Sequence, residues 1–235
     1  MAPLGGTFNQ LTTDIATVLN QDGRVRVMPV IGASLQNVRD VVLLRGVDLA
    51  LITSEVMGDF RKSQELGSNI DVQVTYIAPL LPFEVHLVGW RGISSINDLR
   101  GKKVNFNNKG SSMANVWPLL FKALGIETQA VFLSQTDALA LMKRGELDAT
   151  MSFSAKPQLG LPEIPADLGF KLLSVPYHAS LQEGFLPATF SHEDYPNLIG
   201  KDERIDTFAS IAVLISFYWP KGSTRVNRLR MLLGM

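Results

Sequence analysis

The chain begins with a helical pattern of apolar residues. Between residues 7 and 20 the apolar positions, among them Phe8, Leu11 and Ile15, are three or four residues apart, which predicts an amphipathic helix. Residues 24–30 then alternate between apolar and polar side chains, which predicts a strand. The first elements are therefore expected to be a helix followed by a strand.

Helical and strand-like patterns continue to alternate. Ser34 is the expected N-cap of the next helix, and Gly46 and Gly145 are expected to end helices because glycine readily adopts left-handed conformations. Ser134, with Asp137 three residues later, predicts another helix start. Strands are expected at residues 47–52, 84–90, 103–107, 129–133, 147–153 and 170–175, and a further helix at 113–124. This alternation predicts an α/β protein with a largely parallel sheet. Residues 177–207 give no clear pattern, and residues 208–219 read as a buried strand or strand pair.

Two segments of the chain are similar to each other. Residues 44–50 and 143–149 both combine a helix end, a glycine and an aspartate that enters an apolar strand. Two lobes of similar winding would produce this repetition, although any two strand–helix units can look alike. For Asp48 and Asp148 we expect a turn-stabilising role rather than acid–base chemistry.

Composition narrows the functional class. The 235 residues suffice for one large domain or two small lobes, and 46% are hydrophobic, which indicates a folded core. The net charge is zero, so no nucleic acid or anionic membrane partner is expected. There is no cysteine, which excludes disulfides and thiolate chemistry.

The longest apolar run, residues 208–219, is shorter than the ~20 residues of a membrane-spanning helix. Met1 is followed by Ala-Pro-Leu-Gly-Gly, without the features of a secretory signal.

Catalytic motifs are not evident. The three histidines, His86, His178 and His192, lack metal-ligand spacing, and His86 is expected to be a hydrogen-bonded core residue. Nucleophile-elbow, Walker A and dinucleotide-binding glycine motifs are absent from the sequence. We therefore expect neither an enzyme nor a cofactor or metal.

A glycine and a hydroxyl residue stand at three predicted helix starts. These are Gly6 with Thr7, Gly32 with Ser34, and Gly110 with Ser111 and Ser112, the last preceded by Lys109. Such turns offer free backbone N–H groups, a hydroxyl and the positive end of a helix dipole, which together suit an anion. Simple N-capping explains any one of them, whereas three favour a shared ligand site.

The order of these motifs resembles a known family. The stretches that carry the resemblance are Gly5–Phe8, Val30–Asn37, Arg45–Leu51, Ile96–Val104, Gly110–Ser111 and Gly145–Ala149. Together they are similar to the TAXI family of TRAP-transporter solute receptors over roughly residues 4–220.

The resemblance implies an α/β fold like that of type II periplasmic binding proteins: two lobes of mixed sheet flanked by helices, with a ligand cleft between them. Lobe one would comprise residues 1–86, completed by 208–235, and lobe two residues 87–207. Relative to the family, the chain would lack the first strand and the C-terminal helix. The implied protein is a monomer in the periplasm that passes a small organic anion, such as glutamate or a dicarboxylate, to TRAP transporter membrane subunits.

The resemblance also implies a set of ligand-binding residues. They are Gly6, Thr7, Phe8, Ser34, Ser54, Glu55, Asn107, Lys109, Ser111 and Ser112. Hydroxyls and N–H groups would hold a carboxylate, Phe8 would give apolar contact, and Glu55 would accept from an amino-acid ammonium. The alternatives are a ligand-sensing or enzymatic domain on the same fold, or a truncated paralogue that binds nothing.

Overall fold

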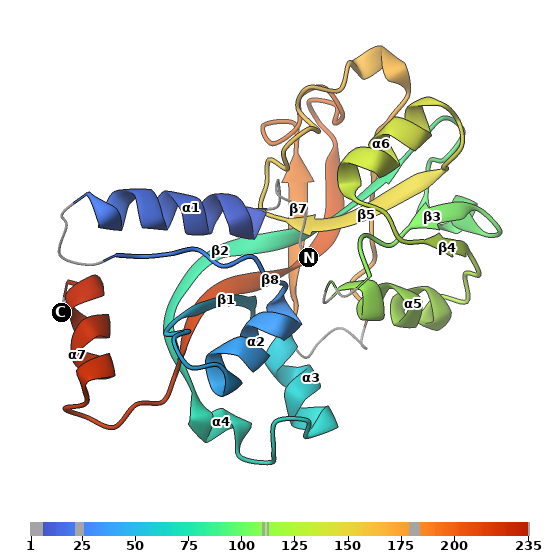
Figure 1. Ribbon diagram of the computed structural model, residues 1–235. Helices are drawn as coiled ribbons and strands as arrows, with labels where there is room; N and C mark the ends of the chain where they lie inside the picture. Colours follow the sequence, from blue (N-terminus) through green and yellow to red (C-terminus); the bar gives the residue numbers. More distant parts are fainter. Residues whose placement is uncertain (1–6, 22–25, 110, 112, 179–183, 235) are drawn as a thin grey trace. The chain divides into compact units, whose positions relative to one another are not determined.

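The computed structural model divides the chain into two compact units (Figure 1). It describes residues 7–21, 26–109, 111, 113–178 and 184–234. Unit 1 consists of Met1–Leu81 and Ala212–Met235, and unit 2 of Pro82–Ile211. Both boundaries fall inside long strands, β2 (Val74–Gly89) and β8 (Arg204–Phe217), so each of these strands contributes residues to both units.

The described part of unit 1 contains five helices, the short strand β1 and parts of β2 and β8. The helices are α1 (Thr7–Asn20), α2 (Ser34–Leu43), α3 (Val56–Ser63), α4 (Ile70–Gln73) and α7 (Thr224–Leu232). The strand β1 (Ala50–Thr53) pairs antiparallel with β8, and Ile52 faces Val213 in the register. All four residues of β1 are buried, which explains why this short segment is apolar until its last position.

Two expectations for unit 1 are wrong. Over the described part of residues 24–30 no strand forms, and Met28 and Val30 are 71% and 75% exposed. An alternating pattern gives a strand only where a sheet offers a partner and a face to cover, and residues 26–30 have neither. The chain also has a C-terminal helix, α7, which was expected to be missing. Ser223 caps α7, because its side chain accepts a hydrogen bond from the Val226 N–H.

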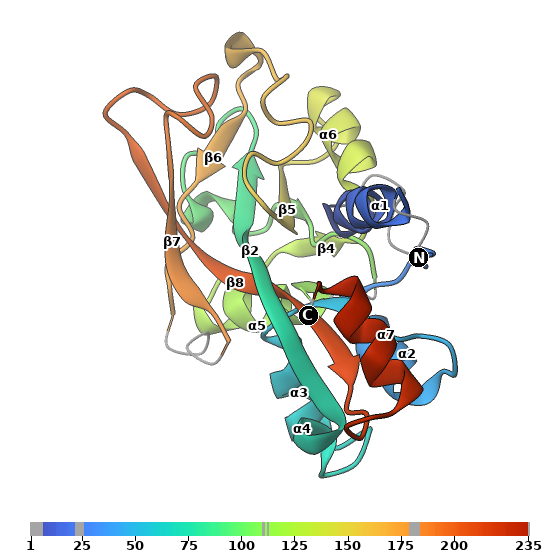
Figure 2. The same ribbon diagram turned by 90° about the vertical axis from the view of Figure 1, so that its left-hand side faces the viewer.

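Unit 2 contains most of the sheet. Its further elements are η1 (Ile96–Leu99), β3 (Lys103–Asn105), α5 (Met113–Ala123), β4 (Gln129–Val131), α6 (Gln135–Lys143), β5 (Ala149–Ser154), η2 (Ala166–Leu168), β6 (Lys171–Leu173) and β7 (Leu186–Ser191). The strands follow the order β2-β5-β3-β4, with β6 beside β2 and β7 beside β8 (Figure 2).

The sheet is mixed, and the expectation that it would be largely parallel is wrong. The pairings of β3 with β4 and of β3 with β5 are parallel. β2 runs antiparallel to β5 and β6, and β7 runs antiparallel to β8. The helices α5 and α6 connect β3, β4 and β5, whereas the described connection from β5 to β6 contains only the short 3-10 helix η2, so the alternating pattern predicted the first part correctly.

Local signals at helix ends are confirmed in unit 2. The Ser134 side chain accepts a hydrogen bond from the Asp137 N–H and caps α6. Gly145 follows α6 at φ +75°, a conformation that side chains rarely adopt, and a Cβ there would lie 3.0 Å from the Trp90 ring. These residues end and begin helices where the sequence predicts it.

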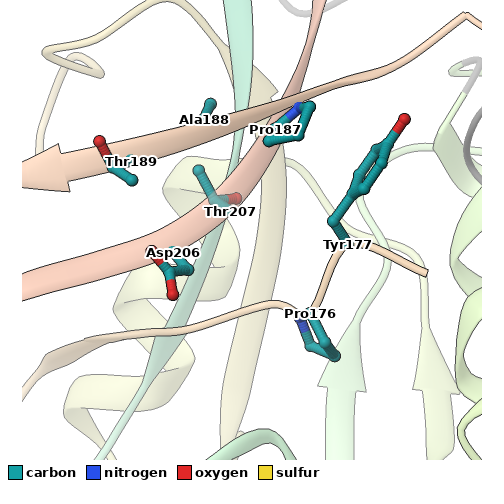
Figure 3. A pocket seen from close by; sticks show the side chains of 7 residues that line it. All are labelled: Pro176, Tyr177, Pro187, Ala188, Thr189, Asp206 and Thr207. Carbon is teal, nitrogen blue, oxygen red and sulfur yellow. The ribbon is translucent and has the colours of Figure 1, made fainter.

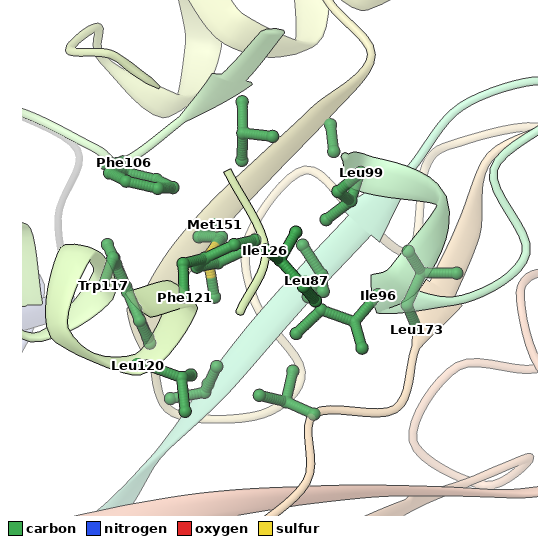
Figure 4. Close-up of a cluster of buried hydrophobic side chains, with 14 of the residues drawn as sticks. Leu87, Ile96, Leu99, Phe106, Trp117, Leu120, Phe121, Ile126, Met151 and Leu173 are labelled. Atoms are coloured by element: carbon green, nitrogen blue, oxygen red, sulfur yellow. The ribbon is translucent and has the colours of Figure 1, made fainter. Parts of the chain in front are cut away.

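Two hydrophobic clusters form the core of unit 2. The first lies between the sheet and α5 and includes Leu87, Phe106, Trp117, Phe121 and Met151 (Figure 4). Trp117 is fully buried in this cluster, so its ring serves packing rather than ligand stacking. The second cluster includes side chains of α6, β6 and β7, and the elements β2, β6 and β8 contribute to both clusters.

A hydrogen-bonded imidazole, that of His86, packs against the second hydrophobic cluster of unit 2. The Nδ1 of His86 is 3.0 Å from the backbone oxygen of Glu84, and because a carbonyl can only accept, Nδ1 carries the hydrogen. Nε2 therefore accepts from the Tyr195 hydroxyl, 2.7 Å away, and the Tyr195 oxygen in turn accepts from the Gln158 N–H at 2.7 Å. The ring also stacks on Phe190 at 4.5 Å. The expected core role of His86 is confirmed.

Burial shifts two neighbouring pKa values in opposite directions. Loss of hydration lowers the pKa of the fully buried His86 to about 3. It raises the pKa of Glu84 to about 7, although the charge of Lys156 opposes this shift. Asp194, which is paired with Lys156 at 3.1 Å, adds a smaller effect that favours the protonated forms of both groups.

We expect Tyr195→Phe to destabilise the protein by about 1–3 kcal/mol. The substitution leaves His86 Nε2 without a donor and the Gln158 N–H without an acceptor, inside a buried network. Urea unfolding at pH 7 measures the loss. Tyr177→Phe is the matched control, because the Tyr177 hydroxyl donates only to the Phe185 carbonyl from a partly exposed position. Equal losses in the two variants would contradict the role of the network.

We also expect Glu84→Gln to change how stability depends on pH. Between about pH 4.5 and 6.5 the unfolded chain gains a proton at His86 and the folded chain gains one at Glu84, so their contributions cancel. Without the Glu84 carboxyl, stability should fall as the pH drops below 6.5, by up to about 1.4 kcal/mol per pH unit. Relative to the wild type the variant should gain stability as the pH rises from about 4.5 to 7, and the difference should then stay constant, because the wild type carries a buried charge at Glu84 from there on.

Urea unfolding of wild type and variant from pH 4.5 to 8 tests this expectation. Glu163→Gln removes an exposed carboxyl of the same unit and is the control. A Glu84→Gln profile parallel to that of the wild type would show that Glu84 is ionised throughout this range.

Candidate functional site

Three polar side chains gather at the carboxyl end of β1 in unit 1. Thr53 ends the strand, Glu55 precedes α3, and Ser34 is the first residue of α2. The Thr53 hydroxyl donates to Glu55 Oε1 at 2.5 Å, and Ser34 Oγ lies 3.4 Å from Thr53 Oγ1. All three residues are buried, with Glu55 8% exposed. This Ser34–Thr53–Glu55 group places a carboxylate among hydroxyls, a combination that suits a ligand with N–H donors.

The expectation that Ser34 caps α2 is wrong. Ala33 is the N-cap residue, and no side chain caps this helix. The Ser34 hydroxyl instead faces Thr53, because α2 packs on β1 and brings the two side chains together. Asn37 on the next turn of α2 fixes this packing by donating from Nδ2 to the Leu51 carbonyl at 2.7 Å.

The other predicted residues of unit 1 lie in two places. Thr7 and Phe8 are the first two residues of α1 and are partly buried. Ser54, also partly buried, stands between Thr53 and Glu55. Gly6 lies outside the described residues.

In unit 2 the predicted residues share the turn that follows β3. Asn107 adopts φ +66°, and its side-chain oxygen accepts from the Asn108 N–H at 2.7 Å. Ser111 caps α5 by accepting from the Ala114 N–H at 3.2 Å. The exposed Lys109 places its Nζ 5.5 Å from the centre of the Phe132 ring, so this cation lies beside the segment that follows β4. Ser112 lies outside the described residues.

Three polar residues of unit 2 that the sequence analysis missed meet beside the end of β3. Asn105 ends β3, is in register with Thr150 of β5, and contacts the Leu133 backbone after β4. Gln135 begins α6, and its side-chain oxygen accepts from the Thr150 hydroxyl at 2.9 Å. Asn105 and Thr150 are fully buried, but their strands contain other polar residues such as Lys103 and Ser152, so the sequence gives no distinct signal for them.

A pocket of about 400 Å³ lies elsewhere in unit 2 (Figure 3). Its lining residues come from β7, β8 and the segment after β6: Pro176, Tyr177, Pro187, Ala188, Thr189, Asp206 and Thr207. Two of its hydroxyls are already committed, since Thr207 donates to the Val85 carbonyl and Tyr177 to the Phe185 carbonyl. The pocket contains none of the ten predicted residues, so we do not take it as the candidate site.

The candidate groups combine opposite charges with neutral donors and acceptors. Unit 1 supplies the Glu55 carboxylate, and unit 2 supplies the Lys109 ammonium. Within the described ranges, no three histidine, aspartate or glutamate side chains come together as a metal site would require. Over the same ranges, none of the helices has the length and apolar character needed to cross a bilayer.

Solved structures with a similar fold are ligand-binding domains. The regulatory domain of CcmR from Synechocystis, in complex with 2-PG, is 13% identical with a TM-score of 0.57, over 97% of this chain and 92% of that one. The effector-binding domain of QuiR, in complex with shikimate, is 13% identical with a TM-score of 0.56, over 97% and 90%. An ancestral arginine-binding protein bound to arginine is 18% identical with a TM-score of 0.51, over 95% and 80%.

These likenesses confirm the fold class that the sequence predicts, a mixed α/β fold like that of periplasmic binding proteins. No curated protein matches the sequence. The sequence model of the NMT1-like family, however, matches residues 1–216, which is most of the chain. The protein therefore belongs to the NMT1-like family.

Proposed function

We propose that this protein is an extracytoplasmic solute receptor that binds a small organic anion of the amino-acid or dicarboxylate class, such as glutamate. In this proposal the receptor belongs to the TAXI type, works in the periplasm, delivers its ligand to a TRAP-type membrane transporter, and performs no catalysis. The family membership and the ligands named for proteins of similar fold support a binding role.

One observation carries the proposal: each unit gathers polar side chains where a strand ends and a helix begins. In unit 1 these are the Ser34–Thr53–Glu55 group between β1, α2 and α3. In unit 2 they are the turn from Asn107 to Ser111, which leads from β3 into α5. In open α/β sheets, ligands bind at the carboxyl ends of strands, where loops and helix starts supply unpaired N–H groups.

The two groups differ in the part of a ligand that each would bind. Lys109 suits a carboxylate, because its ammonium carries a full positive charge and donates hydrogen bonds. Glu55, held by the Thr53 hydroxyl at 2.5 Å, suits an ammonium group. An amino acid carries both a carboxylate and an ammonium group, whereas a plain dicarboxylate carries no ammonium.

A ligand-sensing domain is the second candidate function. The CcmR and QuiR structures are regulatory and effector-binding domains, and this chain covers nine-tenths or more of each. Both candidate functions require ligand binding. Uptake of labelled ligand into proteoliposomes that contain TRAP-type membrane subunits distinguishes them, because only a transport receptor should stimulate it.

We expect small carboxylates to raise the melting temperature of the purified protein. L-Glutamate, glutarate, succinate and L-arginine form a suitable panel, read by thermal shift at pH 7. At a hundred times its dissociation constant, a ligand adds about 2.7 kcal/mol, or several degrees in a protein of this size. A larger shift with L-glutamate than with glutarate would support the role of Glu55, because the two acids differ by the ammonium group. A folded sample that responds to none of these compounds would contradict the proposed function.

We further expect Lys109→Ala to weaken carboxylate binding about fivefold, since an exposed cation contributes roughly 1 kcal/mol. Lys201→Ala removes an exposed lysine from another part of unit 2 and should leave affinity unchanged. Isothermal titration calorimetry with L-glutamate measures both. Equal weakening in the two variants would indicate a general effect of net charge and would contradict a local role for Lys109.

A further inference from the structure

A chain of hydrogen bonds in unit 2 begins at a backbone donor that has only one possible role. The Leu133 N–H donates to Asn105 Oδ1 at 2.8 Å. This bond fixes the orientation of the Asn105 amide, because an N–H can only donate and the atom facing it must be the oxygen. Asn105 Nδ2 therefore points to Thr150, whose hydroxyl oxygen lies 3.0 Å away, and also reaches the Leu133 carbonyl at 3.3 Å.

The orientation of the Asn105 amide determines, through Thr150, the orientation of the Gln135 amide. Because Thr150 Oγ1 accepts from Asn105, its single hydrogen is available for Gln135 Oε1, 2.9 Å away. Thr150 is fully buried and is held by its strand, so the hydroxyl has a defined position. The buried hydroxyl hydrogen of Thr150 needs an acceptor, so the Gln135 amide turns its oxygen toward Thr150 and its nitrogen away from it.

Gln135 Nε2 thus ends the chain with two N–H donors. The nitrogen is buried and has no hydrogen-bond partner among the described residues. A buried donor without an acceptor is costly and uncommon in native proteins, so such a group calls for a missing acceptor. The donors that precede it are all satisfied, and only the last one is left open.

We propose that Gln135 Nε2 donates to an oxygen of the bound ligand, and that Asn105 and Thr150 hold the amide in this orientation. The inference rests on the proposed function and adds to it a specificity residue that requires an acceptor: a carboxylate or carbonyl oxygen. Asn105 and Thr150 act through Gln135 and are positioning residues.

The surroundings of Gln135 favour an anionic oxygen. Asn105 and Val131 end two parallel strands in register, so the amide lies at the end of the sheet where the loops after β3 and β4 meet. Lys109 reaches the segment between β4 and Gln135, with its Nζ 5.5 Å from the centre of the Phe132 ring. The Lys109 ammonium and the Gln135 amide N–H groups therefore lie in the same part of unit 2, and both are suited to a negatively charged oxygen.

Calorimetric titration of the whole protein with L-glutamate and with glutarate tests the inference. Gln135→Glu keeps an oxygen for the Thr150 hydroxyl but replaces both donors by a negative charge, and should weaken binding of both acids at least tenfold. Gln135→Met removes the donors without adding charge and should weaken binding about tenfold. Gln129→Glu makes the same change of charge at the exposed start of β4 and should stay within twofold of wild type.

Two readouts separate ligand contact from a structural role. The melting temperature of ligand-free Gln135→Glu should match that of the wild type within about two degrees, because the variant keeps the only bond that this side chain makes among the described residues. The side-chain amide signals of Gln135, identified in a ¹⁵N–¹H spectrum by their absence from Gln135→Met, should shift when either acid is added. Thr150→Val, which lets the amide rotate, should weaken binding about threefold, and Thr150→Ser should restore it.

The possible failures are distinguishable. Wild-type affinity in both Gln135 variants, together with weaker binding by Lys109→Ala, would overturn the inference and leave the proposed function standing. Amide signals that do not move on addition of a bound acid would also overturn it, and would indicate that water occupies the donors. Wild-type protein that binds neither acid would overturn the inference along with the proposed function.

Discussion

The interior of unit 2 is governed by the requirement that buried donors find acceptors. Two backbone N–H groups, those of Gln158 and Leu133, each begin a chain of side-chain hydrogen bonds. Backbone groups cannot reverse their roles, so they determine which atom of the next side chain must face them. The chain that begins at Gln158 leads to the tautomer of His86, and the chain that begins at Leu133 leads to the orientation of the Gln135 amide.

The two chains differ in how they end. The chain from Gln158 closes on the Glu84 carbonyl, and every group between is satisfied, which is the arrangement of a purely structural network. The chain from Leu133 finishes on a nitrogen that has no acceptor among the described residues. The requirement for hydrogen-bond partners is met at both ring nitrogens of His86, whereas it is not met at Gln135 Nε2.

The sequence predicts local structure well where the deciding forces are local. Ser134, Gly145 and the helical pattern of residues 7–20 act through their own neighbourhood, and the structure follows them. Strand pairing depends on residues far away in the chain, and so the expected strand at 24–30 did not form and the direction of most pairings was not foreseen. The order of motifs, rather than any single one, led to the correct fold class.

The candidate site could be predicted only in outline. The turns at Ser34 and at Lys109 have a visible pattern of glycine, hydroxyl and charge. Thr53 and Gln135 have none, because their importance comes from the residues that they meet across the fold. The role of Ser34 illustrates the limit: the sequence suggested a helix cap, whereas the packing of α2 on β1 directs its hydroxyl to Thr53. Contacts between residues far apart in the sequence decide whether such a side chain caps a helix or faces a strand, and a local motif contains no information about these contacts.

The division of β8 between the two units has a consequence for how the protein is made. During synthesis, every residue of unit 2 leaves the ribosome before Ala212, where the second segment of unit 1 begins. Within the described part of the chain, β1 pairs only with residues 212–215, so its backbone groups have no strand partner until those residues have been made. Unit 1 can therefore complete the pairing of β1 only after all residues of unit 2 have been made, although its own first segment is made earlier.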